Sequence, residues 1–105
     1  MIKANEAYAR TEANITNIKT IAYSYMDELA PSIEKEILNA TRDCSKYCTI
    51  TINRVDLASK GITSEDQKKY FNTYAKAYLT ALGYAVTAHE TFSGGVAIAI
   101  CWEEV

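Results

Sequence analysis

The sequence is poor in the residues and motifs from which catalytic sites are usually built. It has one His, one Pro and one Trp among 105 residues, and only four Gly. The pair Gly94-Gly95 is followed by no helix pattern and has no nearby lysine, so it lacks the parts of a phosphate-binding loop. No nucleophile, base or metal set can be assembled from a motif. We therefore expect a protein that is not an enzyme, with no cofactor and with no catalytic, cofactor-binding or metal-binding residues.

The cysteines are too few and too scattered to indicate a metal site. Three thiols cannot all pair within one chain, which agrees with a reducing compartment. Cys44, Cys48, His89 and Cys101 are residue types that bind zinc, but only Cys44 and Cys48 are close in sequence, and they straddle a helix end and a strand start. No motif supports a cysteine nucleophile served by His89. We interpret the three cysteines as free thiols of the core.

The sequence also has no basic excess and no long apolar run. Its formal net charge is -2, which argues against nucleic acid as the main partner. No apolar run reaches the length needed to cross a bilayer, and the first residues lack the apolar core of a signal peptide. We expect synthesis in the cytoplasm and no membrane partner. The proportions of hydrophobic residues, 49%, and charged residues, 23%, are typical of one soluble globular domain.

The first thirty residues have the apolar spacing of a packed helix. Four of their apolar residues are seven positions apart, and two more fall between these at spacings of three and four, which predicts a helix over about 6–29. These residues are Tyr8, Ile15, Ile18, Ala22, Tyr25 and Leu29. The other faces are rich in Asn and Thr, which are mediocre helix formers, so this helix should depend on a packing partner in its own domain or in another subunit. Pro31 predicts a break or kink, after which a second helix runs over about 31–44.

The rest of the chain alternates between strand and helix patterns. Cys48, Ile50 and Ile52 predict one face of a strand that starts at Tyr47. A loop is expected over 54–62, and overlapping capping boxes at Thr63 and Ser64 predict a third helix that Gly83 ends in a left-handed conformation. Further strands are expected from Tyr84 to Ala88 and from Val96 to Trp102, with a loop over 89–95.

The order of these elements predicts an α+β fold. It consists of a long N-terminal helix, a second helix and then a strand-helix-strand-strand unit with a three-stranded mixed sheet, joined by a right-handed crossover. We expect a single domain over 1–105, in which 1–30 form a protruding or docking helix and 31–105 form a compact α+β unit. The last strand is apolar on both faces, so it should be central or meet another chain.

Tyrosine is over-represented, with eight residues against two Phe and one Trp. Tyr70, Tyr74 and Tyr78 follow one edge of the predicted third helix, near several lysines. Rings spaced in this way can stack on bases, but the acidic net charge disfavours that interpretation. They can also half-cover the sheet with their hydroxyls in water. A protein contact surface fits best, because tyrosine offers a large contact area and a polar tip.

One motif at the end of the third helix resembles a known class of proteins. Leu82, Gly83, Tyr84 and Val86, followed by Ile98, Ile100 and Trp102, are similar to the helix-hairpin junction and terminal strand of small α+β proteins encoded by tailed bacteriophages and prophages. The resemblance covers about 33–102, and the long N-terminal helix has no counterpart in it. It implies no catalytic residues. It implies a phage product that is part of the particle or acts on host proteins.

We therefore expect a non-enzymatic structural or accessory virion protein, made in the host cytoplasm and located in the virion. Its partners would be itself or other virion subunits, and we expect a homo-oligomer. The predicted interface comprises the N-terminal helix and the tyrosine stripe: Tyr8, Ile15, Ile18, Ala22, Tyr25, Leu29, Tyr70, Tyr74 and Tyr78. On this hypothesis Ile18→Asp should abolish assembly and leave the strand and third-helix unit folded. The alternative is a small intracellular phage effector that binds and inhibits a host protein through the tyrosine stripe and acidic residues.

Overall fold

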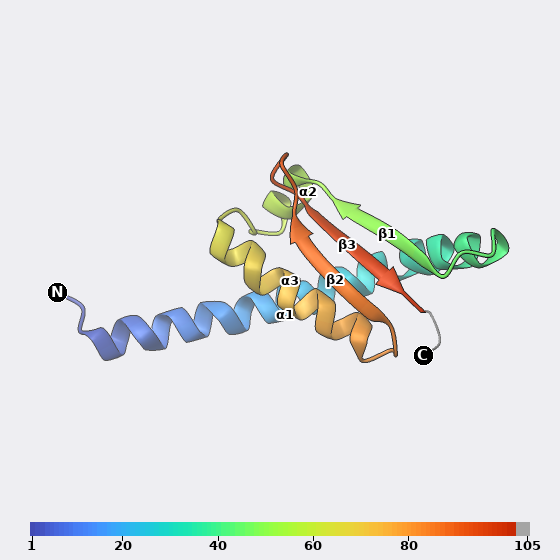
Figure 1. Cartoon of the computed structure of the whole chain (residues 1–105). Helices are drawn as coiled ribbons and strands as arrows, with labels where there is room; N and C mark the ends of the chain where they lie inside the picture. Colours follow the sequence, from blue (N-terminus) through green and yellow to red (C-terminus); the bar gives the residue numbers. More distant parts are fainter. Residues whose placement is uncertain (103–105) are drawn as a thin grey trace.

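The computed structural model describes residues 1–102 and confirms the α+β class. The elements in chain order are α1 (Ala4–Arg42), β1 (Tyr47–Ile52), α2 (Arg54–Ser59), α3 (Glu65–Thr80), β2 (Ala85–Glu90) and β3 (Val96–Cys101) (Figure 1). The last three residues of the predicted domain, 103–105, lie outside the described residues.

The three strands form a sheet in the order β1-β3-β2, and both neighbouring pairs are antiparallel. The prediction of a mixed sheet was wrong. The crossover through α3 does make β1 and β2 parallel to each other, but β3 lies between them and runs opposite to both (Figure 1). β3 is therefore the central strand, as its two apolar faces predicted.

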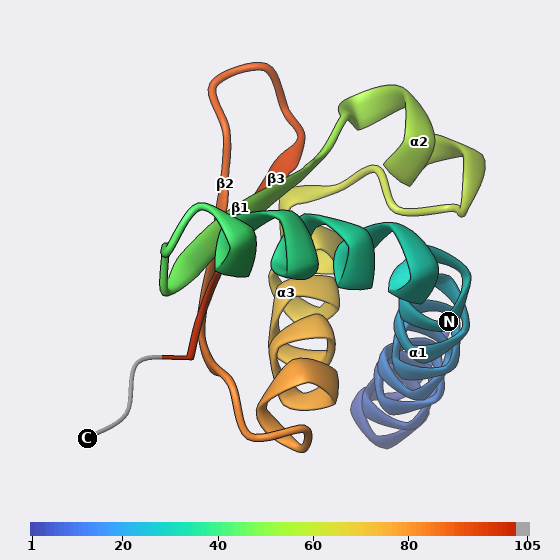
Figure 2. The same ribbon diagram turned by 90° about the vertical axis from the view of Figure 1, so that its right-hand side faces the viewer.

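α1 is one continuous helix of 39 residues with Pro31 inside it. The prediction of a separate second helix after Pro31 was wrong, whereas the kink, the alternative to a break, is present (Figure 2). A proline inside a helix removes one backbone hydrogen bond and kinks the helix, and packing on both sides of Pro31 keeps α1 continuous here. Ile33 is buried and Ile37 is half-buried, so the apolar stripe continues past the proline. Figure 2 looks nearly along the N-terminal part of α1 and shows its C-terminal part running across the view, so the helix changes direction.

The C-terminus of α1 is closed by a Schellman motif. The N–H of Ser45 donates to the carbonyl of Ala40, and the N–H of Cys44 donates to the carbonyl of Thr41. This places Cys44 in the left-handed region, with φ of 61°, and leaves its side chain exposed. The prediction that all three cysteines belong to the core was wrong for Cys101, which lies on the face of β3 away from the helices, and for Cys44. Its position is set by the turn that ends the helix.

Cys44→Gly is expected to raise the free energy of unfolding by about 1 kcal/mol, because glycine adopts the left-handed conformation without the Cβ clash. Urea denaturation followed by circular dichroism measures the change. Asp43→Gly is the matched control, because Asp43 has φ of -83° and gains nothing from glycine there. Equal stability changes for the two variants would contradict the explanation.

Local sequence signals predicted some ends of the helices and strands correctly and missed others. The predicted loop over 54–62 was wrong in part, because the Asn53 side chain accepts a hydrogen bond from the N–H of Asp56 and starts the short helix α2. The capping box of Ser64 and Gln67 at the start of α3 is confirmed. Gly83 has φ of +97° and ends α3, as predicted. β2 runs on through His89 and Glu90, which had been assigned to a loop.

The core lies between one face of the sheet and the two helices α1 and α3. Cys48, Ile50 and Ile52 of β1 turn to this side, as their alternation predicted. Figure 2 shows α1 and α3 on the same side of the sheet, and no helix within residues 1–102 covers the other side. That open face is uncharged and made mainly of small side chains. It consists of Tyr47, Thr49, Thr51, Ala85, Thr87, His89, Ala97, Ala99 and Cys101.

The N-terminal part of α1 projects from this body (Figure 1). Every residue from 1 to 14 is exposed, and Ile18 is the first buried residue of the chain. We call residues 4–17 the arm. The arm is shorter than the predicted protruding segment of 1–30, because the helix joins the core from Ile18 onward.

Candidate interaction surfaces

The structure divides the predicted docking helix into a core part and a projecting part. Ile18, Ala22 and Tyr25 are buried in the chain's own core, and Leu29 is half-buried against it. These four side chains already have their packing partner in α3 and the sheet. Tyr8, which is 68% exposed, and the half-buried Ile15 are the two predicted residues that the arm still presents to a partner.

The arm is a weak helix by its own sequence. The hydroxyls of Thr11 and Thr16 donate to the carbonyls four residues earlier, a contact that competes with the helix ladder and slightly destabilises it. Fourteen residues of this composition form only a marginal helix in water without tertiary contacts. The apolar stripe of the core nevertheless continues along the arm through Ile15 and Tyr8. The arm is therefore a helix that needs packing contacts to be stable and has an apolar side that can make them.

The three predicted contact tyrosines lie between α3 and α1. Tyr70, Tyr74 and Tyr78 are half-buried and pack against the core. The ring of Tyr23 on α1 lies 6.3 Å from that of Tyr74 and 6.1 Å from that of Tyr78. The Lys19 ammonium lies 5.9 Å from the Tyr74 ring centroid. A good part of this aromatic area is therefore used to hold the long helix and is not free for a separate partner.

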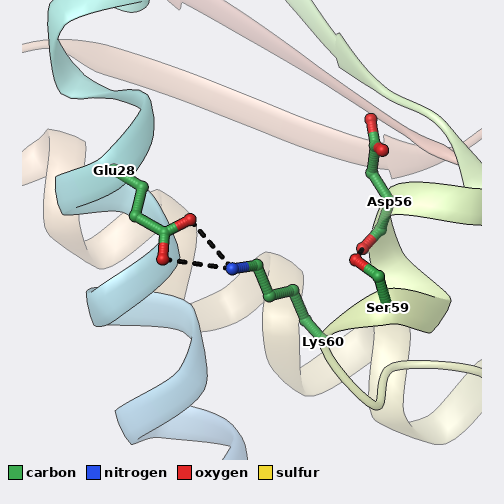
Figure 3. Close-up of polar contacts among 4 residues, drawn as sticks. All are labelled: Glu28, Asp56, Ser59 and Lys60. Carbon is green, nitrogen blue, oxygen red and sulfur yellow. Dashed lines mark hydrogen bonds and ion pairs between the residues drawn. The ribbon is translucent and has the colours of Figure 1, made fainter.

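Two polar contacts fix α1 against the rest of the chain. The Tyr78 hydroxyl donates a 2.7 Å hydrogen bond to Asp27, and this bond is the main reason why the pKa of Tyr78 is raised. Lys60, which follows α2, donates to both carboxylate oxygens of Glu28 on α1, at 3.1 and 2.8 Å (Figure 3). The hydrogen bond to Glu28 raises the pKa of Lys60. The Lys60 ammonium also lies 5.1 Å from the ring centroid of Tyr25. These contacts position α1 against α3 and the end of α2.

The thiols and the single histidine lie apart. Cys48 faces the core, and burial raises the pKa of its thiol, which disfavours the reactive thiolate. His89 and Cys101 share the open face of the sheet, but their registers differ by four residues, or about 13 Å. No group of three His, Cys, Asp or Glu within residues 1–102 could hold a metal ion.

Two of the grooves beside the helices differ in character. The first, of about 270 Å³, lies between the C-terminal part of α1 and the end of α3 and is mainly apolar, with Ile37, Leu38 and Leu82 in its walls. The second, of about 510 Å³, lies between α3 and β2 and has mainly polar residues in its walls. It is lined by Glu65, Lys69, Asn72, Thr73, Lys76, Thr87, Ala88 and Glu90. Neither groove could be predicted from the sequence, because the sequence alone does not show which helices and strands lie side by side.

No helix among residues 1–102 combines the length and the apolar character needed to cross a bilayer. Comparison with models of protein families, with curated proteins and with solved structures finds no match to this chain. Function is therefore inferred from the surfaces described above.

Proposed function

We propose that the protein is a non-enzymatic structural or accessory component of a phage particle, and that its arm binds a neighbouring subunit. The observation that carries this proposal is the arm itself: an exposed helix of mediocre propensity with Tyr8 and Ile15 on one side. Burial of that side against another subunit would supply the packing that the arm lacks within its own chain. The phage assignment is supported by the resemblance around Leu82, Gly83, Tyr84 and Val86.

The neighbouring subunit in this proposal is a second copy of the chain. A homo-oligomer places the same apolar stripe on both partners, so two arms can cover each other. The arm has few charges on the stripe side, and this allows close approach of two identical surfaces. Glu6 and Arg10 lie away from the line that joins Tyr8 and Ile15, whereas Glu12 lies on it, four residues after Tyr8 and three before Ile15.

The double variant Tyr8→Asp with Ile15→Asp is expected to convert the oligomer to a monomer, because it places charge at the centre of the proposed contact. Sedimentation velocity measures the change, and the thermal midpoint of the compact unit should fall little, because Tyr8 is exposed and Ile15 only half-buried. Ala9→Asp with Ala13→Asp is the matched control. It adds the same charge to the other side of the arm and should leave the oligomer intact.

A wild-type chain that sediments as a monomer at every concentration would overturn the arm contact. The particle assignment is tested separately, by mass spectrometry of gradient-purified particles against whole lysate. A fixed copy number per particle supports the proposal. Abundance in the lysate with absence from particles would overturn it and favour an effector that binds a host protein.

A further inference from the structure

β2 is an edge strand whose outer backbone groups are unpaired within residues 1–102. The N–H of Thr91 donates to the carbonyl of Gly95, and ladder hydrogen bonds in an antiparallel pair then recur at every second residue. The backbone N–H and C=O groups of Val86, Ala88 and Glu90 therefore point away from β3. No hydrogen bond from the described residues reaches them. This edge is a template for one more strand.

α3 runs beside this edge and forms the second wall of the 510 Å³ groove. The tight turn after α3 makes α3 and β2 antiparallel neighbours (Figure 1). Six residues of β2 span about 20 Å, so an extended segment of about five residues fits along the edge. Its side chains would point alternately toward α3 and toward solvent.

The α3 wall carries two lysines and one asparagine that have no side-chain partner among residues 1–102. Neither Lys69 nor Lys76 forms an ion pair within residues 1–102. The side-chain oxygen of Asn72, between them, is buried and accepts no hydrogen bond from the described residues. Buried acceptors without a partner are uncommon, and a donor on a bound segment would satisfy this one. Glu65 and Glu90 make the opposite end of the groove acidic.

We propose that this groove binds an extended peptide segment of a partner protein, which adds beside β2 as a fourth strand and directs carboxylate side chains toward Lys69 and Lys76. Backbone hydrogen bonds to Val86, Ala88 and Glu90 supply affinity, and the lysines supply selectivity for acidic side chains. The surface is distinct from the arm, so the inference goes beyond the proposed function and does not depend on it.

A partner peptide fits the groove better than a second copy of β2. The only carboxylate of β2 is Glu90 at its end. A second β2 paired antiparallel about Ala88 would place each Glu90 opposite Val86 of the other copy. Such pairing brings only one carboxylate to each groove, so one of its two lysines stays without a match.

The test uses the full chain and the synthetic peptide acetyl-Val-Glu-Val-Glu-Val-amide at about 1 mM, with hydrogen exchange of each amide followed by NMR. In the free protein the amides of Val86, Ala88 and Glu90 should exchange faster than those of Thr87 and His89. The peptide should slow exchange at the first three positions selectively. The lysine analogue, acetyl-Val-Lys-Val-Lys-Val-amide, should bind at least about tenfold more weakly.

Ala88→Pro removes the outward-pointing backbone N–H at the centre of the β2 edge and keeps the hydrogen bonds between β2 and β3. It should weaken peptide binding at least about tenfold. Thr49→Pro makes the same change at the free edge of β1 and should leave binding unchanged. The double variant Lys69→Glu with Lys76→Glu should bind the lysine peptide more tightly than the glutamate peptide. This variant tests the proposal even if Ala88→Pro fails to fold.

Three results would overturn the proposal. One is unchanged exchange at Val86, Ala88 and Glu90 with the acidic peptide present. Another is equal binding of the two peptides. The third is slow exchange at these three amides in concentrated protein alone, which would identify a second copy as the occupant.

Discussion

Ile18→Asp is expected to lower the free energy of unfolding by about 4 kcal/mol and to destabilise the whole protein. Ile18 is 6% exposed and belongs to the same core as Phe71 and Leu79 of α3. The substitution removes a buried apolar side chain and places a carboxylate among the apolar side chains of that core. Domains of this length have a free energy of unfolding of about 5–15 kcal/mol. The substitution therefore removes a large fraction of it.

Urea denaturation of Ile18→Asp, followed by the circular dichroism of the helices and by tyrosine fluorescence, measures this loss. Asn17→Asp is the control, because it adds the same charge at the neighbouring exposed position and should change stability by less than about 0.5 kcal/mol. If Ile18→Asp unfolds with wild-type stability, Ile18 does not belong to the core and the division between arm and body is misplaced.

This expectation differs from the one that the sequence favoured, in which Ile18→Asp abolishes assembly and spares the compact unit. The spacing of Tyr8, Ile15, Ile18 and Leu29 correctly predicted one apolar stripe on one helix. It could not show where along the stripe the chain's own core ends. That boundary depends on where α3 and the sheet lie against the helix, and no local pattern states it.

The same limit explains the tyrosines and Pro31. The four-residue spacing of Tyr70, Tyr74 and Tyr78 predicted a shared face, and they do share one. The ring that packs against Tyr74 and Tyr78 belongs to Tyr23, which lies some fifty residues away in sequence. At Pro31 the local preference for a helix end was outweighed by burial of Ile33, which keeps both halves of α1 on the core.

The order of the strands was within reach of the sequence. The two apolar faces of 96–101 indicated a central strand, and the hairpin made it antiparallel to the strand before it. A central β3 must also neighbour β1. Since the crossover makes β1 and β2 parallel, β3 is antiparallel to both, and the sheet cannot be mixed. The groove at β2 follows only from this order, because it requires β2 to be an edge strand beside α3.

Gly95→Ala is expected to lower the free energy of unfolding by about 3 kcal/mol. The sequence presents Gly94-Gly95 as a single turn signal, but the two glycines serve different needs. Gly94 has φ of +84°, whereas Gly95 is buried where β3 begins, against the end of β1. A Cβ on Gly95 would overlap the Ile52 carbonyl oxygen and lie 3.1 Å from the Asn53 Cα. Both neighbours are backbone, so relief of the contact must move β1 or the start of α2.

Urea denaturation of Gly95→Ala should be compared with that of Gly61→Ala. Gly61 has φ of +86°, but a Cβ added there would meet no atom within 4 Å, so its substitution tests the left-handed conformation alone, at about 1 kcal/mol. A larger loss at Gly95 than at Gly61 means that close approach of β1 to β3 requires glycine there. Equal losses would show that the strands separate easily at this end, and that the pairing of Ile52 with Val96 contributes little to the sheet.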